Sequence, residues 1–451
     1  MSKTYTQEYQ EKLINASQAA QMINSGDYIL YGGMLGRPID FDVELAKRKE
    51  ELHDVYIYMS TTLLPPVRTA ASDPSHEHFT CNNFYFSAID RRMADHNLMY
   101  YLPSHLSEAQ TMLERPENPN YTCVVQVCPM DNEGFFSFGP ANVYSYTGCL
   151  GADRVILEVN ENMPRVPGGS EDAIHISQID YIIEGSNSPL FELPPTAEPS
   201  DIDMTMAKLI LNEIEDRACL QLGIGTLPDL LGELICDSDL KDLGIHTEMF
   251  CNSMVPLFTK GLVTNRYKTF DRNKIGFTFC LGTRETYDFI EDNPLMASHP
   301  SSYSNDPRII SLNDKVVSIN NILTVDLFSQ VCSESIGFRQ ISGTGGQLDF
   351  VEGARYSKGG KSFLCLTSTY TDKEGKMHSR IVPTLEPGSI VTTPRASVDY
   401  LVSEYGLAKV KGEATWKRAE LIIELAHPQF RDELIKEAER MRIWRRSNKI
   451  E

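Results

Sequence analysis

The chain has 451 residues, a formal net charge of −20, 41% hydrophobic residues and 23% charged residues. A single hydrophobic core stops growing near about 250 residues, so this length indicates two or three domains, and the composition excludes a disordered or fibrous protein. The strong negative charge argues against a protein that binds nucleic acid or lies on an anionic membrane, because both partners would be repelled.

In the first part of the chain, short apolar runs that are typical of buried strands alternate with helical patterns. We expect strands at residues 27–35, 55–60, 98–103, 123–130, 154–160 and 181–185. Strands whose apolar residues run without alternation are buried on both faces, as in parallel or mixed sheets that helices cover. This part therefore predicts an open α/β domain over residues 1–184.

Residues 185–203 contain four prolines and several acids without a sustained period, so we predict an interdomain linker here. Further strands are expected at 218–225, 274–282, 316–321, 361–369 and 389–393, and closing helices at 415–426 and 428–444. Both halves contain a strand, a glycine turn and then a proline, which points either to duplication or to coincidence. We expect a second α/β domain of related topology over residues 204–451, with the active site between the two domains.

Two glycine-rich segments of the second half are candidates for holding an anion. A predicted strand ends at Gly223, Ile224 and Gly225, and a helix with Pro228 near its start follows. Free N–H groups and the positive end of the helix dipole accept anions at such a place, although an ordinary βα turn also explains the pattern. The third glycine of the dinucleotide fingerprint is missing, so a Rossmann cofactor is poorly supported.

The densest glycine segment, residues 341–369, includes Gly343, Gly345 and Gly346, followed by Gln347. Glycine lets a backbone approach a ligand closely, so such clusters often cradle anions. The string from Gly359 to Ser362 is similar to the end of a P-loop, but Arg355 occupies the position where a P-loop has its first glycine. Binding of a nucleoside triphosphate is therefore rejected.

Other polar residues have two readings each. Glu248 follows His246 and Thr247 near a predicted strand end, where an acid is commonly a solvated or capping residue. In the first half, Glu158, Asn160, Asn162 and Arg165 follow a strand and form either a site loop or an ordinary loop. Basic residues gather around Trp444, and we interpret them as the cation-rich end of a last helix: Arg440, Arg442, Arg445, Arg446 and Lys449.

Metal and triad chemistry find little support. His76 and His78 are two residues apart, but no His-x-x-Glu-His partner accompanies them, and the chain has no G-x-S-x-G elbow. The ten cysteines form no C-x-x-C pair and lie mostly in apolar runs, which indicates buried reduced thiols. With neither a signal peptide nor an apolar run long enough for a membrane span, a cytoplasmic location is expected, or a matrix one if a presequence has been removed.

Strings along nearly the whole chain are similar to one known family. They include VCPMDNEGFFSFGP, ILEVNENMPR, CLQLGIGTLPD, LKDLGIHTEM, SGTGGQLDFVEGA, KGGKSFLCLTST and IELAHPQFRDELIKEAE. The chain resembles the acetyl-CoA hydrolase/transferase branch of the family I CoA-transferases, especially its butyryl-CoA:acetate CoA-transferases and the related 4-hydroxybutyrate CoA-transferases.

The resemblance implies a role for each matching position. The glutamate of the family's GIHSEM string, which accepts the acyl group, matches Glu248. The family's GIG turn matches Gly223, Ile224 and Gly225, whose amides would serve the oxyanion and the CoA thioester. The GxGGQxDF string matches Gly343, Gly345, Gly346, Gln347 and Asp349, which implies a loop that closes over CoA and the reacting carboxylate.

By the same resemblance, the substrates are an acyl-CoA and a short-chain carboxylate, and CoA is transferred by a ping-pong mechanism through a glutamyl-CoA thioester. No metal or organic cofactor is implied, and a homodimer or homotetramer is expected. Two alternatives remain: a short-chain acyl-CoA hydrolase that uses the same glutamate, and a non-catalytic CoA sensor. Residues 31–52 depart from the butyryl enzymes, so propionyl, 4-hydroxybutyrate and succinyl transfer also stay open.

Overall fold

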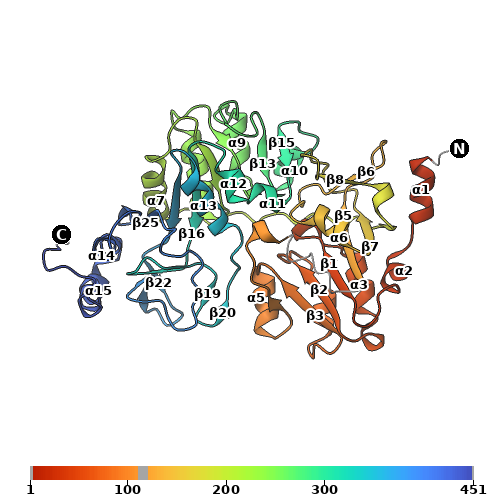
Figure 1. The fold of residues 1–451 in the computed structure, drawn as a ribbon, viewed down its shortest axis with the longest axis horizontal. Coiled ribbons are helices and arrows are strands. Elements are labelled where there is room, and N and C mark those ends of the chain that lie inside the picture. The colour runs from red at the N-terminus through yellow and green to blue at the C-terminus, as the bar shows by residue number, and fades with distance from the viewer. Residues whose placement is uncertain (1–3, 110–119, 449–451) are drawn as a thin grey trace.

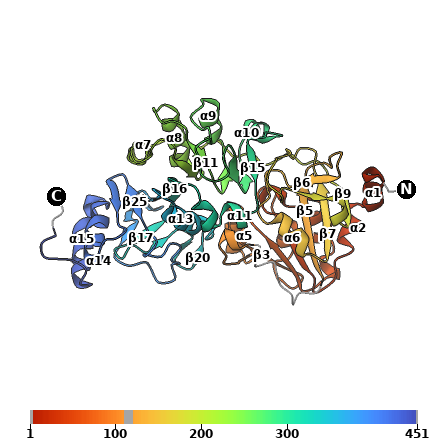
Figure 2. The same ribbon diagram turned by 45° about the horizontal axis from the view of Figure 1, so that its top comes forward.

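The computed structural model describes residues 4–109 and 120–448, which form two α/β parts that each contain one large sheet (Figure 1). In Figure 1 the first part runs from red to yellow and the second from green to blue. Figure 2 shows the same division, with helices α5 (Ala88–Asp95) and α11 (Ser301–Ser304) near the junction. The α/β fold class and its two related parts are as the sequence predicts.

The first sheet is parallel throughout and has the strand order β4-β3-β2-β1-β5-β7-β9. Its first strand therefore lies at the point where the strand order reverses, and ligands bind at the carboxyl ends of open sheets at such a point. The strands are β1 Tyr28–Tyr31, β2 Val55–Met59, β3 Phe79–Asn83, β4 Tyr100–Tyr101, β5 Tyr121–Val127, β7 Arg154–Val159 and β9 Tyr181–Glu184.

The second sheet has the order β11-β10-β16-β21-β25-β26, and only its last pair is antiparallel. Here too the first strand in sequence lies at a reversal, between β11 and β16. The strands are β10 Cys219–Leu222, β11 Gly244–Ile245, β16 Val316–Asn321, β21 Lys361–Cys365, β25 Tyr400–Ser403 and β26 Gly406–Lys409.

Small ladders outside these sheets pair β6 (Phe135–Ser137) with β8 (Ala173–His175), β12 (Met249–Phe250) with β14 (Phe279–Cys280), and β13 (Ile275–Phe277) with β15 (Met296–Ser298). Others contain β17 (Thr324–Asp326), β18 (Val331–Cys332), β24 (Ile381–Val382), β19 (Ser335–Ile336), β20 (Arg339–Gln340), β22 (Thr369–Thr371) and β23 (Met377–Ser379).

The remaining α-helices of the first part are α1 Tyr5–Lys12, α2 Ala16–Ala20, α3 Asp40–Ala46, α4 Arg68–Ser72 and α6 Ser145–Gly151. Those of the second part are α7 Asp201–Leu211, α8 Thr226–Cys236, α9 Met254–Thr259, α10 Arg284–Ile290, α12 Pro307–Ile310, α13 Gln347–Tyr356, α14 Thr415–Glu424 and α15 Pro428–Arg440. Short 3-10 turns are η1 Met34–Gly36, η2 Lys49–Glu51, η3 Leu106–Glu108 and η4 Ile176–Gln178. Within the described ranges, no helix is both long enough and apolar enough to cross a membrane.

The expected strands differ from the structure in a few places. Strand β3 was not expected, because its polar residues interrupt the apolar signal, and the ladder of β25 and β26 also escaped prediction. The strand expected at 389–393 is wrong: Thr393 makes only an isolated bridge to Val331. Its β-branched residues favour a strand locally, but no neighbouring strand pairs along it.

Residues 185–200 contain neither helix nor strand, and α7 begins at Asp201, so the last residues of the predicted linker are helical. The connection is nevertheless anchored, because Leu193 donates its N–H to the Gly282 carbonyl and the Tyr287 hydroxyl donates to the Phe191 carbonyl. The division into domains at this segment stays a prediction.

The C-terminal basic cluster is not simply the end of a helix. Helix α15 ends at Arg440, and Arg442 has a positive φ of 60° beyond it. Arg445 instead stacks over the Trp416 ring with its guanidinium carbon 3.8 Å from the ring centroid, while Lys449 lies outside the described residues. All ten cysteines are free. Nine are buried, and Cys236 is partly exposed.

The two parts pack tightly against each other. Buried apolar residues form one continuous cluster across the junction, and backbone hydrogen bonds connect the two sides, such as Cys280 N–H to the Pro140 carbonyl and Val143 N–H to the Thr278 carbonyl. The segments that follow β1 and β10 thereby border one cavity, which Met34 and Gly223 both line.

Candidate active site

A cavity of about 260 Å³ lies between the two parts, and Glu248 lines it. The first part contributes Met34, Ser60, Thr61, Tyr85 and Leu106 to its wall. Most of the residues singled out in the sequence also line it: Gly223, Ile224, Gly343, Gly345, Gly346 and Gln347. The structure thus brings together residues that are far apart in the sequence.

Glu248 lies in the bend between β11 and β12, and its backbone is fixed there. Its carbonyl accepts the N–H groups of Thr278 at 2.9 Å and Phe279 at 3.3 Å. Its half-buried carboxylate accepts a 2.7 Å hydrogen bond at Oε2 from the side-chain amide of Asn305, and the N–H of Gly346 also donates to the carboxylate. One oxygen of the carboxylate is therefore already held by a donor.

Burial raises the pKa of Glu248 to about 7, and the negative charge of Asp349 adds to this shift. The hydrogen bonds from Asn305 and Gly346 act in the opposite direction, because they stabilise the ionised form. The result is a carboxylate with little water around it, which is a better nucleophile than a hydrated one. Glu248 also raises the pKa of the Tyr85 hydroxyl, although burial contributes more to that shift.

The glycine turn after β10 takes the shape that the sequence predicts. Strand β10 ends at Leu222, and Gly225 caps helix α8 with a φ of 111°, a conformation that favours glycine. Ile224 and Gly225 also border a second, larger hollow of about 1250 Å³ on the other side of the turn. Gly225 lines this hollow and is not among the residues that line the smaller cavity, so the turn borders two spaces.

The second glycine segment lies against the first part of the molecule. Phe86 N–H donates to the Ser342 carbonyl at 3.3 Å, and Leu106 N–H donates to the Gly345 carbonyl at 3.0 Å. Thr344 N–H donates to the Tyr101 hydroxyl at 2.9 Å, and that hydroxyl donates to the buried carboxylate of Glu334 at 3.2 Å. The position of this loop therefore depends on how the two parts pack.

Met34 and Thr61, on the first wall of the cavity, have left-handed backbones, with φ of 54° and 48°. Such a conformation is a true outlier for the β-branched Thr61, and strained residues of this kind cluster at functional sites. Thr61 N–H donates to the Tyr85 carbonyl at 3.1 Å, and Met34 N–H donates to the Ser60 carbonyl at 3.1 Å. No local pattern in the sequence marks either residue.

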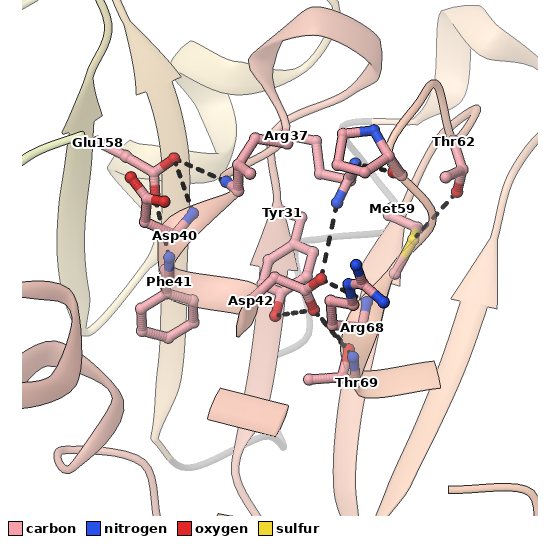
Figure 3. A network of polar contacts seen from close by, with 12 residues as sticks. Tyr31, Arg37, Asp40, Phe41, Asp42, Met59, Thr62, Arg68, Thr69 and Glu158 are labelled. Atoms are coloured by element: carbon pink, nitrogen blue, oxygen red, sulfur yellow. Dashed lines mark hydrogen bonds and ion pairs between the residues drawn. The ribbon is translucent and has the colours of Figure 1, made fainter. Parts of the chain in front are cut away.

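Figure 3 shows the polar network that holds the segment after β1. Buried Arg37 donates to the Pro65 carbonyl and forms an ion pair of 3.7 Å with Asp42, which also accepts from Thr69. Glu158 accepts the N–H groups of Ile39 at 2.7 Å and Phe41 at 2.9 Å, at the start of α3. Burial raises the pKa of Glu158 to about 7.

The polar group around Glu158 therefore belongs to the scaffold of the site. Asn160 donates to the Ser188 carbonyl at 2.9 Å, and Asn162 to the Asn187 carbonyl at 2.7 Å. Arg165 forms an ion pair of 3.0 Å with Asp131. The residues lining the cavity include none of these four side chains.

Over residues 4–109 and 120–448, no group of three or more His, Cys, Asp or Glu side chains is placed to hold a metal ion. His76 and His78 precede strand β3 rather than lie on it, and the ring Nδ1 of His78 contacts the Leu52 carbonyl at 2.7 Å.

Sequence reasoning did not identify Asn305, Tyr85, Met34 or Thr61 as site residues. Asn305 is fully buried at the end of α11, inside the polar string SSYSND, which resembles an ordinary loop. Only the folded chain brings its amide to Glu248, so no spacing rule could have found it.

This arrangement of a partly buried carboxylate and backbone amides in a cavity between the two parts suits acyl transfer, and family models place the chain in one family. The model of the acetyl-CoA hydrolase/transferase N-terminal domain matches residues 1–192, and that of the C-terminal domain matches residues 282–438. The chain belongs to the acetyl-CoA hydrolase/transferase family. Glu248 and the turn at 223–225 lie between the two matched ranges, whereas the glycine loop at 343–347 lies within the second.

The similarity of the chain to individual proteins agrees with this family membership. Butyryl-CoA:acetate CoA-transferase of Anaerostipes caccae is 46% identical over 99% of this chain and 100% of that protein. The 4-hydroxybutyrate coenzyme A transferase of Clostridium kluyveri is 39% identical over 95% of this chain and 97% of that protein. The crystal structure of RipA from Yersinia pestis superposes with a TM-score of 0.89 at 36% identity, covering 98% of this chain and 100% of that chain. The predicted resemblance is thus confirmed.

Proposed function

We propose that the protein is a CoA-transferase that moves CoA between a short-chain acyl-CoA and a free carboxylate, with Glu248 as the acyl acceptor. The observation that carries this proposal is the Glu248 carboxylate in the cavity between the two parts, with the Asn305 amide donating to its Oε2. We propose butyryl-CoA and acetate as the substrate pair, because a relative of 46% identity bears that name. The cavity volume of about 260 Å³ supports the proposal of a short acyl chain as the substrate group.

In the first step, Oε1 of Glu248 attacks the thioester carbonyl carbon, and the carbon–sulfur bond breaks. This gives a mixed glutamyl-acyl anhydride and CoA thiolate. The thiolate then attacks the glutamyl carbonyl carbon and expels the first acid as a carboxylate, which leaves glutamyl-CoA thioester on the protein. The second carboxylate runs both steps in reverse, so charge balances throughout and one hard transfer becomes several easier ones.

Each tetrahedral intermediate carries negative charge on an oxygen that needs hydrogen-bond donors. When the thiolate attacks, the charge develops on Oε2 of Glu248, which Asn305 already contacts at 2.7 Å. The amides of the turn at 223–225 are the proposed donors to the oxygen of the acyl group. One such donor is worth roughly 3 to 4 kcal/mol of transition-state stabilisation.

We further propose that the reaction needs neither a metal nor an organic cofactor, since the nucleophile and the donors all belong to the chain. Family resemblance supports a homodimer or homotetramer, which sedimentation would test. We also propose that the enzyme acts in the cytoplasm and has no nucleic-acid partner.

The proposal is tested by incubating the protein with butyryl-CoA, with and without acetate, and measuring free thiol and acetyl-CoA. A transferase makes acetyl-CoA only when acetate is present, a hydrolase releases CoA in either case, and a sensor does neither. The variant Glu248→Gln should be inactive, because a neutral amide of the same shape cannot form the anhydride. Glu291→Gln, which changes an exposed acid, is the matched control.

The covalent intermediate gives a second test. Wild-type protein treated with butyryl-CoA alone should carry a glutamyl-CoA thioester, which borohydride reduces to an alcohol at that side chain. Peptide mapping that finds the modification at another residue would overturn the assignment of Glu248, even if transfer activity is present.

A further inference from the structure

Asp349 is a buried carboxylate beside the cavity that the reaction above does not use. It lies in the first turn of α13, two residues after the glycine loop, and is only 4% exposed. Its donors come from elsewhere in the chain: Ser107 donates from its N–H to Oδ2 at 3.1 Å and from its hydroxyl to Oδ1 at 2.8 Å. Ser107 belongs to η3 of the first part, so Asp349 connects the two parts at the edge of the site.

Asn305 lies between the carboxylates of Asp349 and Glu248. Its side-chain amide donates to Glu248 Oε2 at 2.7 Å, and it also lowers the pKa of the Asp349 carboxyl, as a nearby donor does. The Ser304 hydroxyl lies 3.5 Å from the amide oxygen of Asn305, on the acceptor side of the group. The amide nitrogen therefore donates to Glu248 and faces Asp349, while the amide oxygen is turned toward the Ser304 hydroxyl.

An asparagine side chain can rotate by about 180° about its last bond, which exchanges the positions of the amide oxygen and nitrogen. Between two ionised carboxylates only one orientation is favourable, because a carboxylate accepts hydrogen bonds and repels the amide oxygen. With a neutral amide in place of Asp349, both orientations of Asn305 find a partner on that side. In the turned orientation, the Asn305 oxygen would face Glu248 and the donor would be lost.

We propose that Asp349, held by Ser107, is a positioning residue for the transfer reaction, which keeps the Asn305 N–H directed at Oε2 of Glu248. The inference rests on the proposed function, because it concerns the charge that forms on Glu248 Oε2 when the CoA thiolate attacks. Asp349 acts through Asn305 and has no contact with the reacting atoms in this arrangement. Because Ser107 of the first part holds Asp349, the direction of the Asn305 N–H also depends on correct packing of the two parts.

The first measurement is the steady-state kinetics of Asp349→Asn with butyryl-CoA and acetate. Losing an oxyanion donor costs about 10² to 10³ in kcat, and a donor that is misdirected part of the time should cost less, about 10-fold to 100-fold. KM for butyryl-CoA should change by less than about 3-fold, because the lost interaction belongs to the transition state. Ser107→Ala removes one of the two Ser107 donors and should lower kcat in the same way, by a smaller factor.

The decisive test is a double-mutant cycle with Asn305→Ala. If Asp349 acts through Asn305, adding Asp349→Asn to Asn305→Ala should lower kcat by less than about 3-fold further. A further fall as large as the one seen in the wild-type background, or a wild-type kcat in Asp349→Asn, would overturn the inference. Asp326→Asn removes another fully buried aspartate of the second part, away from the cavity, and controls for general loss of stability.

The two hypotheses fail in different ways. If Glu248→Gln keeps wild-type turnover, the proposed function itself is wrong. If Glu248→Gln is inactive and borohydride marks Glu248, while the cycle of Asp349 and Asn305 is additive, only the positioning role of Asp349 is wrong. Ser107→Ala keeps the test available should Asp349→Asn fold poorly.

Discussion

Gly346 and Glu248 lie so close together that a methyl group on Gly346 would overlap with Oε2 of Glu248. The same methyl group would also collide with the side-chain nitrogen of Asn305. The backbone at the start of α13 can therefore bring its N–H to the carboxylate only because residue 346 has no side chain.

We predict that Gly346→Ala lowers kcat by at least about 100-fold, because the added methyl displaces the carboxylate or the Asn305 donor from its position. The measurement is kcat with butyryl-CoA and acetate, together with borohydride trapping of the intermediate. Gly151→Ala is the matched control, since a methyl group there meets nothing within 4 Å and should leave kcat unchanged. Wild-type turnover in Gly346→Ala would show that this contact is not needed.

Tyr101 ties the glycine loop to the first part by one hydroxyl, which accepts from Thr344 N–H and donates to Glu334. Tyr101→Phe leaves both groups without this partner, and an unsatisfied buried group costs about 1 to 3 kcal/mol. We expect a lower Tm and a several-fold lower kcat, with less loss in Tyr100→Phe, whose side chain is exposed in the same strand. Equal behaviour of the two variants would contradict this role.

Much of the fold could be predicted because its strands are continuous apolar runs, such as residues 121–127 and 154–159, which keep their character whatever their neighbours are. Strand β3 has the sequence FTCNN, and its polar residues are satisfied only by the folded surroundings, as when Asn83 accepts Thr61 N–H. The opposite error arose at 389–393, where threonine hydroxyls bind loop groups such as Ser333 N–H.

The candidate site divides in the same way. The two glycine segments stand out by their local composition, whereas Glu248 and Asp349 were selected only through the resemblance to a known family, because an acid near a strand end is commonly a solvated or capping residue. Asn305 and Tyr85 were missed, because they reach the cavity only after elements far apart in the chain have packed together. Asn305 is 57 residues from the carboxylate it contacts, and Ser107 is 242 residues from Asp349. Such partners follow from topology rather than from spacing.

Met34 narrows the cavity from the first part, with a side chain that is 7% exposed. Met34→Ala should lengthen the space for the acyl chain. We therefore expect kcat/KM for hexanoyl-CoA to rise about 10-fold relative to kcat/KM for butyryl-CoA, because each methylene of a substrate that fits an apolar pocket contributes about 1 to 3 kcal/mol to transition-state binding. Leu64→Ala is the control, because Leu64 lies nearby but is 61% exposed. An unchanged ratio would place the acyl chain elsewhere.

The last prediction concerns pH. Burial raises the pKa of Glu248 to about 7, and only the ionised carboxylate can attack the thioester. Below that pKa the side chain is protonated, so kcat/KM for butyryl-CoA should rise from about pH 5.5, pass its midpoint near about pH 7 and level off near about pH 8.5. Asp349 has a pKa raised to about 7 by burial as well, and since the two acids interact, the midpoint belongs to the pair.

Removing the charge of Asp349 should lower the pKa of Glu248, because that charge opposes its ionisation. The residual activity of Asp349→Asn should therefore reach its plateau at a lower pH than the wild type does. The measurement is kcat/KM at each pH, since this ratio reports the ionisation of free enzyme, with Tm recorded alongside to confirm that the protein stays folded. A flat profile, or activity that falls as pH rises through about 7, would mean that the titration of Glu248 does not limit the attack.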